Sequence, residues 1–176
     1  MKRVLVIGSG GSGKTTFARR LARSTGLPLF CLDSFYWLPN WQKRSDGEWL
    51  TIVRELVAGE RWIMDGNYGG SLDLRLEACD TVFFLDFPRL TCLRRVLKRQ
   101  LTHLGQRRPE LPAGCRERLD PEFLAWIWTY AARRRPAILE RLSSLEGRKA
   151  IHVFRSGPEI DAHLSSRADP PAFQTH

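Results

Sequence analysis

A glycine-rich string beginning at residue 8 has the residue types and the spacing of a phosphate-binding loop. It fits the pattern G-x-x-x-x-G-K-[ST] at every position, as Gly8-Ser9-Gly10-Gly11-Ser12-Gly13-Lys14-Thr15. The glycines let the backbone curl so that several amide N–H groups point at phosphate oxygens, and a following helix adds its positive amino-terminal end. A flexible Gly-Ser turn is the alternative, but the full string arises by chance in only about one chain in a hundred of this length. We therefore predict a nucleoside triphosphate site over residues 8–16.

Three side chains at the end of this string have separate expected roles. Lys14 can reach the β- and γ-phosphates, Thr15 can place its hydroxyl on Mg²⁺, and Thr16 offers a second hydroxyl to the α-phosphate. The chain lacks the guanine-reading string Asn-Lys-x-Asp, and neither Asp65 nor Asp86 is followed by Glu. These absences disfavour a GTPase and a motor-type ATPase, so a small phosphotransferase is the best fit.

The elements that must position this loop are short apolar runs that alternate with helical patterns. The runs predict buried strands at residues 3–7, 29–32, 62–64, 81–85 and 150–154. Helices are predicted at residues 14–24, at 88–103 and near 158–164. Another helix is predicted to begin at a capping box of Ser45 and Glu48 and to end at Gly59. A last one is predicted to begin at Asp120, to break at Pro136 and to continue beyond it.

This alternation predicts an α/β chain with the P-loop NTPase fold. Its five-stranded parallel sheet would be covered by helices on both faces. We expect a single domain over residues 1–176, with residues 165–176 as a frayed tail.

Ligands of such sheets bind beyond the carboxyl ends of the strands, and four residues fall at those ends: Gly8, Asp33, Asp65 and Asp86. Asp33 can accept the proton of an acceptor hydroxyl, or it can cap the loop that follows it. Asp65 can belong to a metal shell or stabilise a turn before Gly66. Asp86 is expected to be a helix N-cap, because a proline follows two residues later.

Further strings accompany the phosphate loop along the chain. They are Leu32-Asp33, Trp37-Leu38-Pro39-Asn40-Trp41, Trp62-Ile63-Met64-Asp65-Gly66-Asn67-Tyr68, Leu85-Asp86-Phe87-Pro88-Arg89, residues 92–99, Arg108-Pro109 and residues 123–136. Together they resemble the bacterial adenylate-kinase-like family of topology modulation proteins, over nearly all of residues 1–155. The wider similarity to nucleoside monophosphate kinases implies ATP-dependent phosphoryl transfer, with residues 8–16 holding ATP and Mg²⁺.

The same resemblance implies roles for residues outside the loop. Asp65-Gly66 is similar to the strand-end pair of adenylate kinases in which the Asp supports the hydrated metal. Arg95 and Arg99 resemble an arginine pair that clamps the transferring phosphates, and their four-residue spacing puts both on one helical face. A solvated helix face is the alternative for this pair. Asn67-Tyr68 stands where adenylate kinases have Phe-Pro-Arg, so the acceptor is left open.

Two segments are expected to surround the ligands. Residues 33–60 would be the insertion that binds the acceptor, and the Gly-, Pro- and Arg-rich residues 104–119 a small basic lid. At least one arginine is expected to close on the nucleotide, from the set Arg107, Arg108, Arg133, Arg134 and Arg135. Trp37, Trp41 and Tyr68 are expected to stack on a base or line an apolar pocket, whereas Trp49, Trp126 and Trp128 are assigned to packing.

Composition and charge bound the remaining classes. A chain of 176 residues with 43% hydrophobic and 27% charged residues is ordinary for a globular domain. Its four cysteines form no C-x-x-C pair, which disfavours a zinc site or a disulfide framework and indicates free thiols in a reducing cytoplasm. No apolar run approaches the roughly 20 residues of a membrane span. We expect a cytoplasmic protein without a membrane partner.

The charge balance points to an anionic ligand. The net charge is +9, and residues 89–141 hold thirteen Lys and Arg against five Asp and Glu. Such an excess fits either a polyphosphate ligand or a nucleic acid. The favoured hypothesis is a Mg²⁺-dependent phosphotransferase that moves the γ-phosphoryl group of ATP to a small acceptor. The alternative is a nucleotide-dependent nucleic-acid-binding protein that affects DNA topology.

Overall fold

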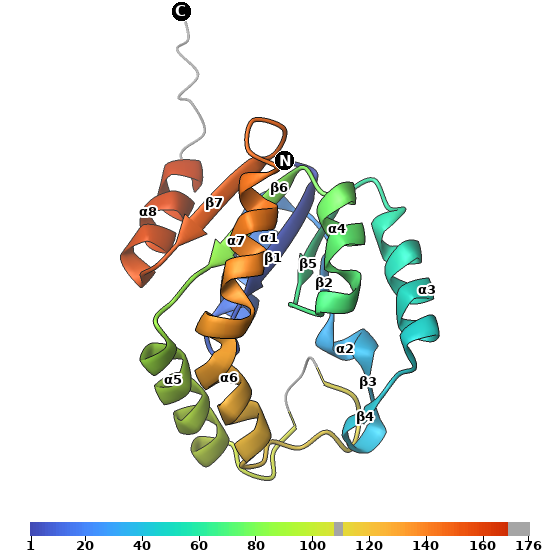
Figure 1. Ribbon diagram of the computed structural model, residues 1–176, viewed down its shortest axis with the longest axis vertical. Helices are drawn as coiled ribbons and strands as arrows, with labels where there is room; N and C mark the ends of the chain where they lie inside the picture. Colours follow the sequence, from blue (N-terminus) through green and yellow to red (C-terminus); the bar gives the residue numbers. More distant parts are fainter. Residues whose placement is uncertain (108–110, 169–176) are drawn as a thin grey trace, which may run out of the picture.

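A computed structural model describes residues 1–107 and 111–168, and its centre is a five-stranded parallel sheet with the order β2-β5-β1-β6-β7 (Figure 1). The sheet strands are β1 (Arg3–Gly8), β2 (Leu29–Cys31), β5 (Trp62–Asp65), β6 (Thr81–Leu85) and β7 (Ala150–Phe154). The main helices are α1 (Lys14–Thr25), α3 (Asp46–Val57), α4 (Leu72–Ala78), α5 (Arg89–Thr102), α6 (Pro121–Arg133), α7 (Arg135–Ser143) and α8 (Gly157–Ala168).

The five predicted strands and the α/β fold class are confirmed. The central strand β1 shows why: its residues Val4, Leu5, Val6 and Ile7 have no exposed surface, as expected for a parallel strand covered on both faces. Because side chains alternate along a strand, β1 sends Leu5 and Ile7 to one face and Val4 and Val6 to the other.

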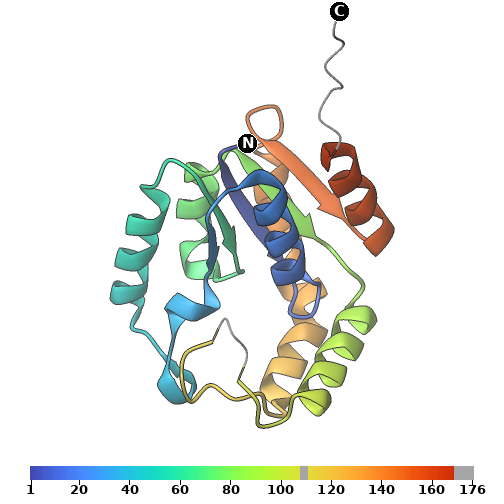
Figure 2. The same ribbon diagram turned by 180° about the vertical axis from the view of Figure 1, so that it is seen from behind.

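Each face of the sheet has its own helical layer. Helices α3, α4 and α7 pack on one face through side chains such as Val53, Leu76 and Leu142. Helices α1 and α8 cover the opposite face through side chains such as Phe17 and Ile160, as Figure 2 shows from behind. The sheet is therefore dry on both sides, and its carboxyl edge is the side where the loops gather.

Shorter elements extend beyond this carboxyl edge (Figure 1). They are α2 (Asp33–Tyr36), the antiparallel hairpin β3 (Trp37–Leu38) and β4 (Gln42–Lys43), and the 3₁₀ turns η1 (Pro39–Trp41) and η2 (Gly69–Ser71). Helices α5 and α6 lie across from them and pack together through Cys92, Val96 and Ile127. Two arms thus extend past the strand ends, and the phosphate loop lies at their base.

Several predictions of helix ends are confirmed in detail. Helix α3 has its capping box, with the Ser45 hydroxyl accepting from the Glu48 amide and Glu48 reaching back to the Ser45 amide. The Asp120 carboxylate caps α6, and the helix is interrupted between α6 and α7, just before Pro136. All four cysteines are free. No helix in the described ranges has both the length and the apolar character needed to span a membrane.

Two predictions are wrong and others fall partly outside the described ranges. Asp86 caps no helix, because the N-cap of α5 is Pro88 and no side chain bonds to that helix end. The Asp86 carboxylate instead accepts two hydrogen bonds from the Arg135 guanidinium, at 2.7 and 2.8 Å. Trp128 is not packed inside, since it is 46% exposed with the Arg89 guanidinium over its ring. Helix α8 continues to Ala168, while residues 108–110 and 169–176 lie outside the described ranges.

The capping box gives a stability prediction. Replacing Ser45→Ala removes the side-chain acceptor at the α3 amino terminus and is expected to lower the free energy of unfolding by about 1 kcal/mol, as measured by urea denaturation. Thr51→Ala is the matched control, because the exposed Thr51 hydroxyl bonds only to the Gly47 carbonyl within the same helix. Equal effects of the two changes would contradict a stabilising role for the box.

Candidate nucleotide and acceptor site

The phosphate loop connects β1 to α1 and leaves the first turn of that helix open. The N-cap is Gly13 in a left-handed conformation with φ of 94°, and no side chain caps the helix. No acidic residue lies in the first turn, so the amide N–H groups and the helix dipole present an uncompensated positive end. The Lys14 ammonium folds back over the loop and donates to the Ser9 carbonyl at 2.9 Å. This arrangement has the charge and the donors to bind an anion.

Glycine is required in this loop because other backbone segments approach it closely. A Cβ on Gly11 would lie 2.4 Å from the Cys92 carbonyl oxygen of α5, and Gly11 has a positive φ of 77°. A Cβ on Gly10 would lie 2.6 Å from the Phe123 ring of α6. The loop therefore packs tightly against helices α5 and α6, and this contact restricts the curvature of the loop.

Thr15 and Asp65 lie together, one on α1 and one at the end of β5. The Thr15 hydroxyl donates to Asp65 Oδ2 at 2.5 Å, and Asp65 is only 5% exposed. A hydroxyl and a carboxylate are both ligands suited to Mg²⁺, which takes few protein ligands when phosphates and water supply the others. No group of three or more His, Cys, Asp or Glu side chains suited to a metal occurs in the described ranges. The pair fits a phosphate-associated ion better than a closed metal cage.

Of the two arginines predicted on α5, only Arg95 reaches the phosphate loop. Its guanidinium donates to the Ser12 carbonyl at 3.3 Å and lies over the Phe87 ring. Arg99, one turn further along, forms an ion pair with Glu117 at 3.1 Å, and Glu117 is almost fully buried. The helical spacing does put both on one side of α5, but the structure directs one to the loop and the other to the 104–119 segment.

Asn67 connects the phosphate loop to the turn that follows β5. Its side-chain oxygen accepts from the Gly8 amide at 2.9 Å, and its side-chain nitrogen donates to the Gly8 carbonyl at 2.5 Å. The side-chain amide thus pairs with the backbone as a neighbouring strand would. The sequence marked Asn67 only as a departure from adenylate kinases, and its position one residue past a strand-end Asp-Gly was the available signal.

Asp33 lies at the start of α2, where it accepts a hydrogen bond from the Tyr68 hydroxyl at 2.5 Å. Burial, together with the nearby Asp33 carboxylate, raises the pKa of Tyr68, so this hydroxyl stays protonated and remains a donor. The centroid of the Tyr68 ring lies 4.5 Å from that of the Tyr36 ring and 4.9 Å from that of the Trp49 ring. Asp33 is therefore held at the edge of an aromatic cluster.

The predicted lid segment contacts the hairpin arm. Trp41 donates its indole N–H to the Arg116 carbonyl at 3.1 Å, and the Cys115 thiol donates to the Leu38 carbonyl at 3.3 Å. A Cβ on Gly114 would lie 2.5 Å from the Asn40 side chain, so the two backbones approach closely. Trp37 stacks edge-on against Trp41 at 5.3 Å, which places both predicted aromatics on this arm.

A cavity of about 270 Å³ opens beside the phosphate loop on the α1 side. Its lining includes Thr16, Phe87, Arg95 and Ile160, together with the Arg20–Asp161 ion pair. Apolar and polar groups are mixed here, as in sites for a base and a sugar.

The other predicted closing arginines have different surroundings. Arg135 is paired with Asp86, and Arg134 has a guanidinium nitrogen 3.9 Å from where a Gly69 Cβ would be. Arg133 is exposed on α6, and Arg108 lies outside the described ranges. The backbone of Arg107 forms an isolated antiparallel β-bridge with that of Arg116. Arg134 is the member of this set that lies beside the turn containing Asn67 and Tyr68.

No protein-family model matches the chain, and no curated protein matches it significantly. Solved structures do match. Shikimate kinase from Bacteroides thetaiotaomicron is 18% identical with a TM-score of 0.59, covering 94% of this chain and 95% of that chain. An inferred kinase from Chloroflexus aurantiacus is 19% identical with a TM-score of 0.53, covering 94% and 97%. A sugar kinase from Janibacter sp. is 23% identical with a TM-score of 0.50, covering 100% and 99%.

The chain has the fold of P-loop kinases. At these identities the likeness establishes the architecture alone, and it agrees with the parallel sheet and the loop geometry described above. Membership of the topology modulation family stays a prediction.

The tight packing of the loop yields a prediction. Gly11→Ala places a methyl group against the Cys92 carbonyl at a positive φ, so it is expected to destabilise the fold and to weaken MgADP binding at least about tenfold by calorimetry. Gly47→Ala is the control, because its Cβ meets no atom within 4 Å on helix α3 and should leave affinity unchanged. Unaltered affinity in Gly11→Ala would show that the loop is not held by α5.

Proposed function

We propose that the protein is an ATP-dependent phosphotransferase that transfers the γ-phosphoryl group of ATP to a small acceptor bearing a hydroxyl group. One observation carries this proposal. Adjacent residues join the two halves of the site: Asn67 binds the backbone of the phosphate loop, and Tyr68 binds the carboxylate of Asp33. The candidate triphosphate-binding loop and the candidate base are thereby both hydrogen-bonded to the same short turn.

The nucleotide would bind along the phosphate loop and α1. The amides of residues 8–16 and the Lys14 ammonium would hold the phosphates, with Thr16 as a further hydroxyl. The cavity beside Thr16, Phe87 and Arg95 would take the base and the sugar. Mg²⁺, when bound, would neutralise charge on the β- and γ-phosphates, and Thr15 and Asp65 are the residues that would hold it.

The acceptor would lie between Asp33, the aromatic arm and the turn at residues 66–71. Asp33 would take the proton from the acceptor hydroxyl as its oxygen bonds to the γ-phosphorus. The bond from that phosphorus to the β,γ-bridging oxygen breaks, and ADP leaves with the electron pair. Lys14 and Arg95 stabilise the charge that builds up on the phosphoryl oxygens, and Arg99 would join them only after parting from Glu117.

A hydroxyl acceptor suits this site better than a phosphate acceptor. Asp33 carries a negative charge that would repel a second phosphate, whereas it accepts a hydroxyl proton readily. The Tyr68 hydroxyl bonds to Asp33, and the Tyr68 ring packs against the ring of Tyr36. These aromatic neighbours favour a neutral, partly apolar acceptor.

Several arginines of the basic region are bound to protein groups, which weakens the support that the charge gives to the nucleic-acid alternative. Arg95 bonds to a backbone carbonyl, and Arg99, Arg135 and Arg141 pair with carboxylates. Nucleotide-dependent nucleic-acid binding remains the alternative hypothesis that the experiment must address.

The first test is product formation. Purified protein is incubated with MgATP and a panel of nucleosides, nucleoside monophosphates, sugars and other small hydroxyl compounds, and ADP and new phosphate esters are followed by chromatography. We expect an ester of a hydroxyl compound. Transfer to a nucleoside monophosphate would overturn the acceptor class, and ADP formation that requires DNA or RNA and gives no ester would favour the alternative.

Variants assign the roles. Lys14→Ala should reduce turnover at least about a thousandfold while circular dichroism shows an intact fold, because it removes charge stabilisation in the transition state. Asp33→Asn should lower kcat about a hundredfold or more without a matching loss of ATP affinity. Lys98→Ala, an exposed cation on α5, is the control for net charge. Retained turnover in Lys14→Ala would contradict the assignment of residues 8–16 as the ATP site.

A further inference from the structure

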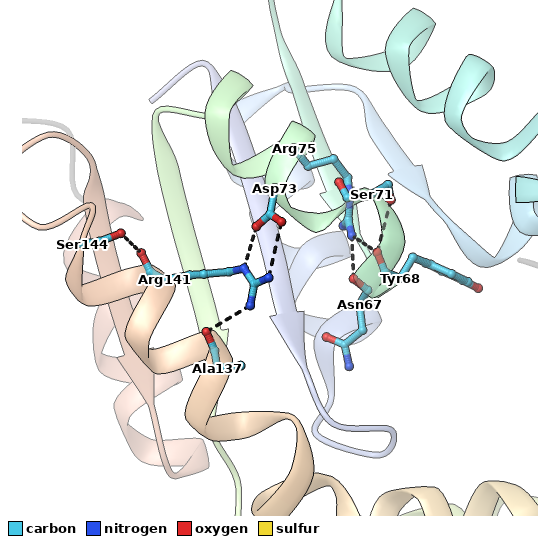
Figure 3. Close-up of polar contacts among 8 residues, drawn as sticks. All are labelled: Asn67, Tyr68, Ser71, Asp73, Arg75, Ala137, Arg141 and Ser144. Carbon is cyan, nitrogen blue, oxygen red and sulfur yellow. Dashed lines mark hydrogen bonds and ion pairs between the residues drawn. The ribbon is translucent and has the colours of Figure 1, made fainter. Parts of the chain in front are cut away.

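Arg75 on helix α4 is a cation buried among backbone carbonyls. Its side chain has no exposed surface, and it donates four hydrogen bonds. Figure 3 shows Arg75 together with three of the partner residues, Asn67, Tyr68 and Ser71. The acceptors are the carbonyls of Gly66 at 2.8 Å, Asn67 at 2.5 Å, Tyr68 at 2.9 Å and Ser71 at 3.2 Å. None of these four partners is a carboxylate. Burying a guanidinium in this way is costly, so the contacts it makes must be needed by the fold or by the site.

The turn after β5 explains the need for a cation. Three successive carbonyls, from residues 66 to 68, converge on one point, and their dipoles repel one another unless a donor lies between them. The turn requires unusual backbone angles, with φ of 150° at Gly66 and 30° at Tyr68. The planar fork of five N–H donors in arginine fits such a cluster, and a lysine ammonium offers fewer donors over a smaller span.

With the carbonyls turned inward, the side chains of the turn point outward in two directions. Figure 3 shows Asn67 and Tyr68 diverging from the backbone that Arg75 holds. Asn67 reaches the Gly8 backbone of the phosphate loop, and Tyr68 reaches Asp33 on α2. One buried cation therefore sets the orientation of two contacts that serve different halves of the site.

We propose that Arg75 is a positioning residue that fixes the phosphate loop and Asp33 relative to each other through the turn at residues 66–68. It touches neither ligand and acts through Asn67 on the nucleotide side and through Tyr68 on the acceptor side. The inference rests on the proposed function for the assignment of those two sides. Burial lowers the pKa of Arg75 to about 10, which leaves it charged at neutral pH and able to hold the carbonyls.

The neighbouring Arg141 provides a matched control. It lies on α7 and pairs with Asp73 of α4 at 2.6 Å, two residues before Arg75, but this pair is exposed and makes no contact with the turn (Figure 3). Loss of Arg141 removes an arginine that is bound to α4 from outside, without removing a contact of residues 66–68. Its effect reports on the general consequence of removing a cation near α4.

The test is a double-mutant cycle on MgADP affinity, measured by calorimetry on the full chain. Asn67→Ala and Arg75→Lys should each weaken binding about tenfold, and the double variant should be no weaker than the more severe single variant. Arg141→Met should stay within about twofold of the unsubstituted protein. Losses that multiply in the double variant, or single variants that bind normally, would overturn the proposal.

A second measurement covers the case in which Arg75→Lys does not fold. Hydrogen exchange of the amides in α2, residues 33–36, is followed with and without MgADP in the unsubstituted protein and in Asn67→Ala. We expect MgADP to slow exchange in α2 only when Asn67 is present, because the signal must pass through the turn. Equal slowing in both proteins would overturn the proposal while leaving the proposed function in place. An unsubstituted protein that binds no MgADP would overturn both.

Discussion

The pairing of the Asn67 side-chain amide with both backbone groups of Gly8 is the contact on which the rest of the site depends. It anchors the first residue of the phosphate loop to the turn after β5, two residues past the last pair of the β1–β5 ladder, Val6 and Asp65. From the other side, α5 and α6 press on the loop so closely that Gly10 and Gly11 have no room for a side chain. The curvature of the loop is thus imposed from two sides and does not rely on its own flexible glycines.

This arrangement separates the charges that the chemistry needs from those that hold the protein together. The open end of α1, with Lys14 and Arg95, remains available to an anion because no acidic side chain lies in its first turn. Asp86 and Glu117 are instead placed against Arg135 and Arg99, outside the loop. The carboxylates of this region thus pair with arginines outside the loop, and the open end of α1 keeps its positive character.

Much of the framework was predictable because it depends on local signals. Buried strands appear as unbroken apolar runs, and the capping box at Ser45 and the acidic cap at Asp120 mark helix starts within a few residues. Helix α4 was not predicted, since Leu72, Leu74 and Leu76 alternate with polar residues as they would in a strand.

Features that depend on distant partners could not be predicted in this way. Asp86 meets Arg135, which is 49 residues away, so its position before a proline suggested a cap that does not exist. The role of Arg75 arises from carbonyl groups, which leave no trace in side-chain patterns. The phosphate loop was recognisable because its residues form a contiguous string, whereas the proposed acceptor side would be assembled from α2, the hairpin arm and the turn.

The contact between the predicted lid segment and the hairpin arm makes acceptor shape and lid position interdependent. Asn40 and Trp41 both adopt positive φ angles, of 59° and 61°, which non-glycine residues hold only when their surroundings compensate. The compensation comes from the lid segment, where the Arg116 carbonyl accepts from the Trp41 indole and Gly114 packs on Asn40. Displacing the lid would release these angles and alter the arm that carries Trp37. Under the proposed function, an acceptor bound against that arm would act on the same contacts that hold residues 114–116 against it.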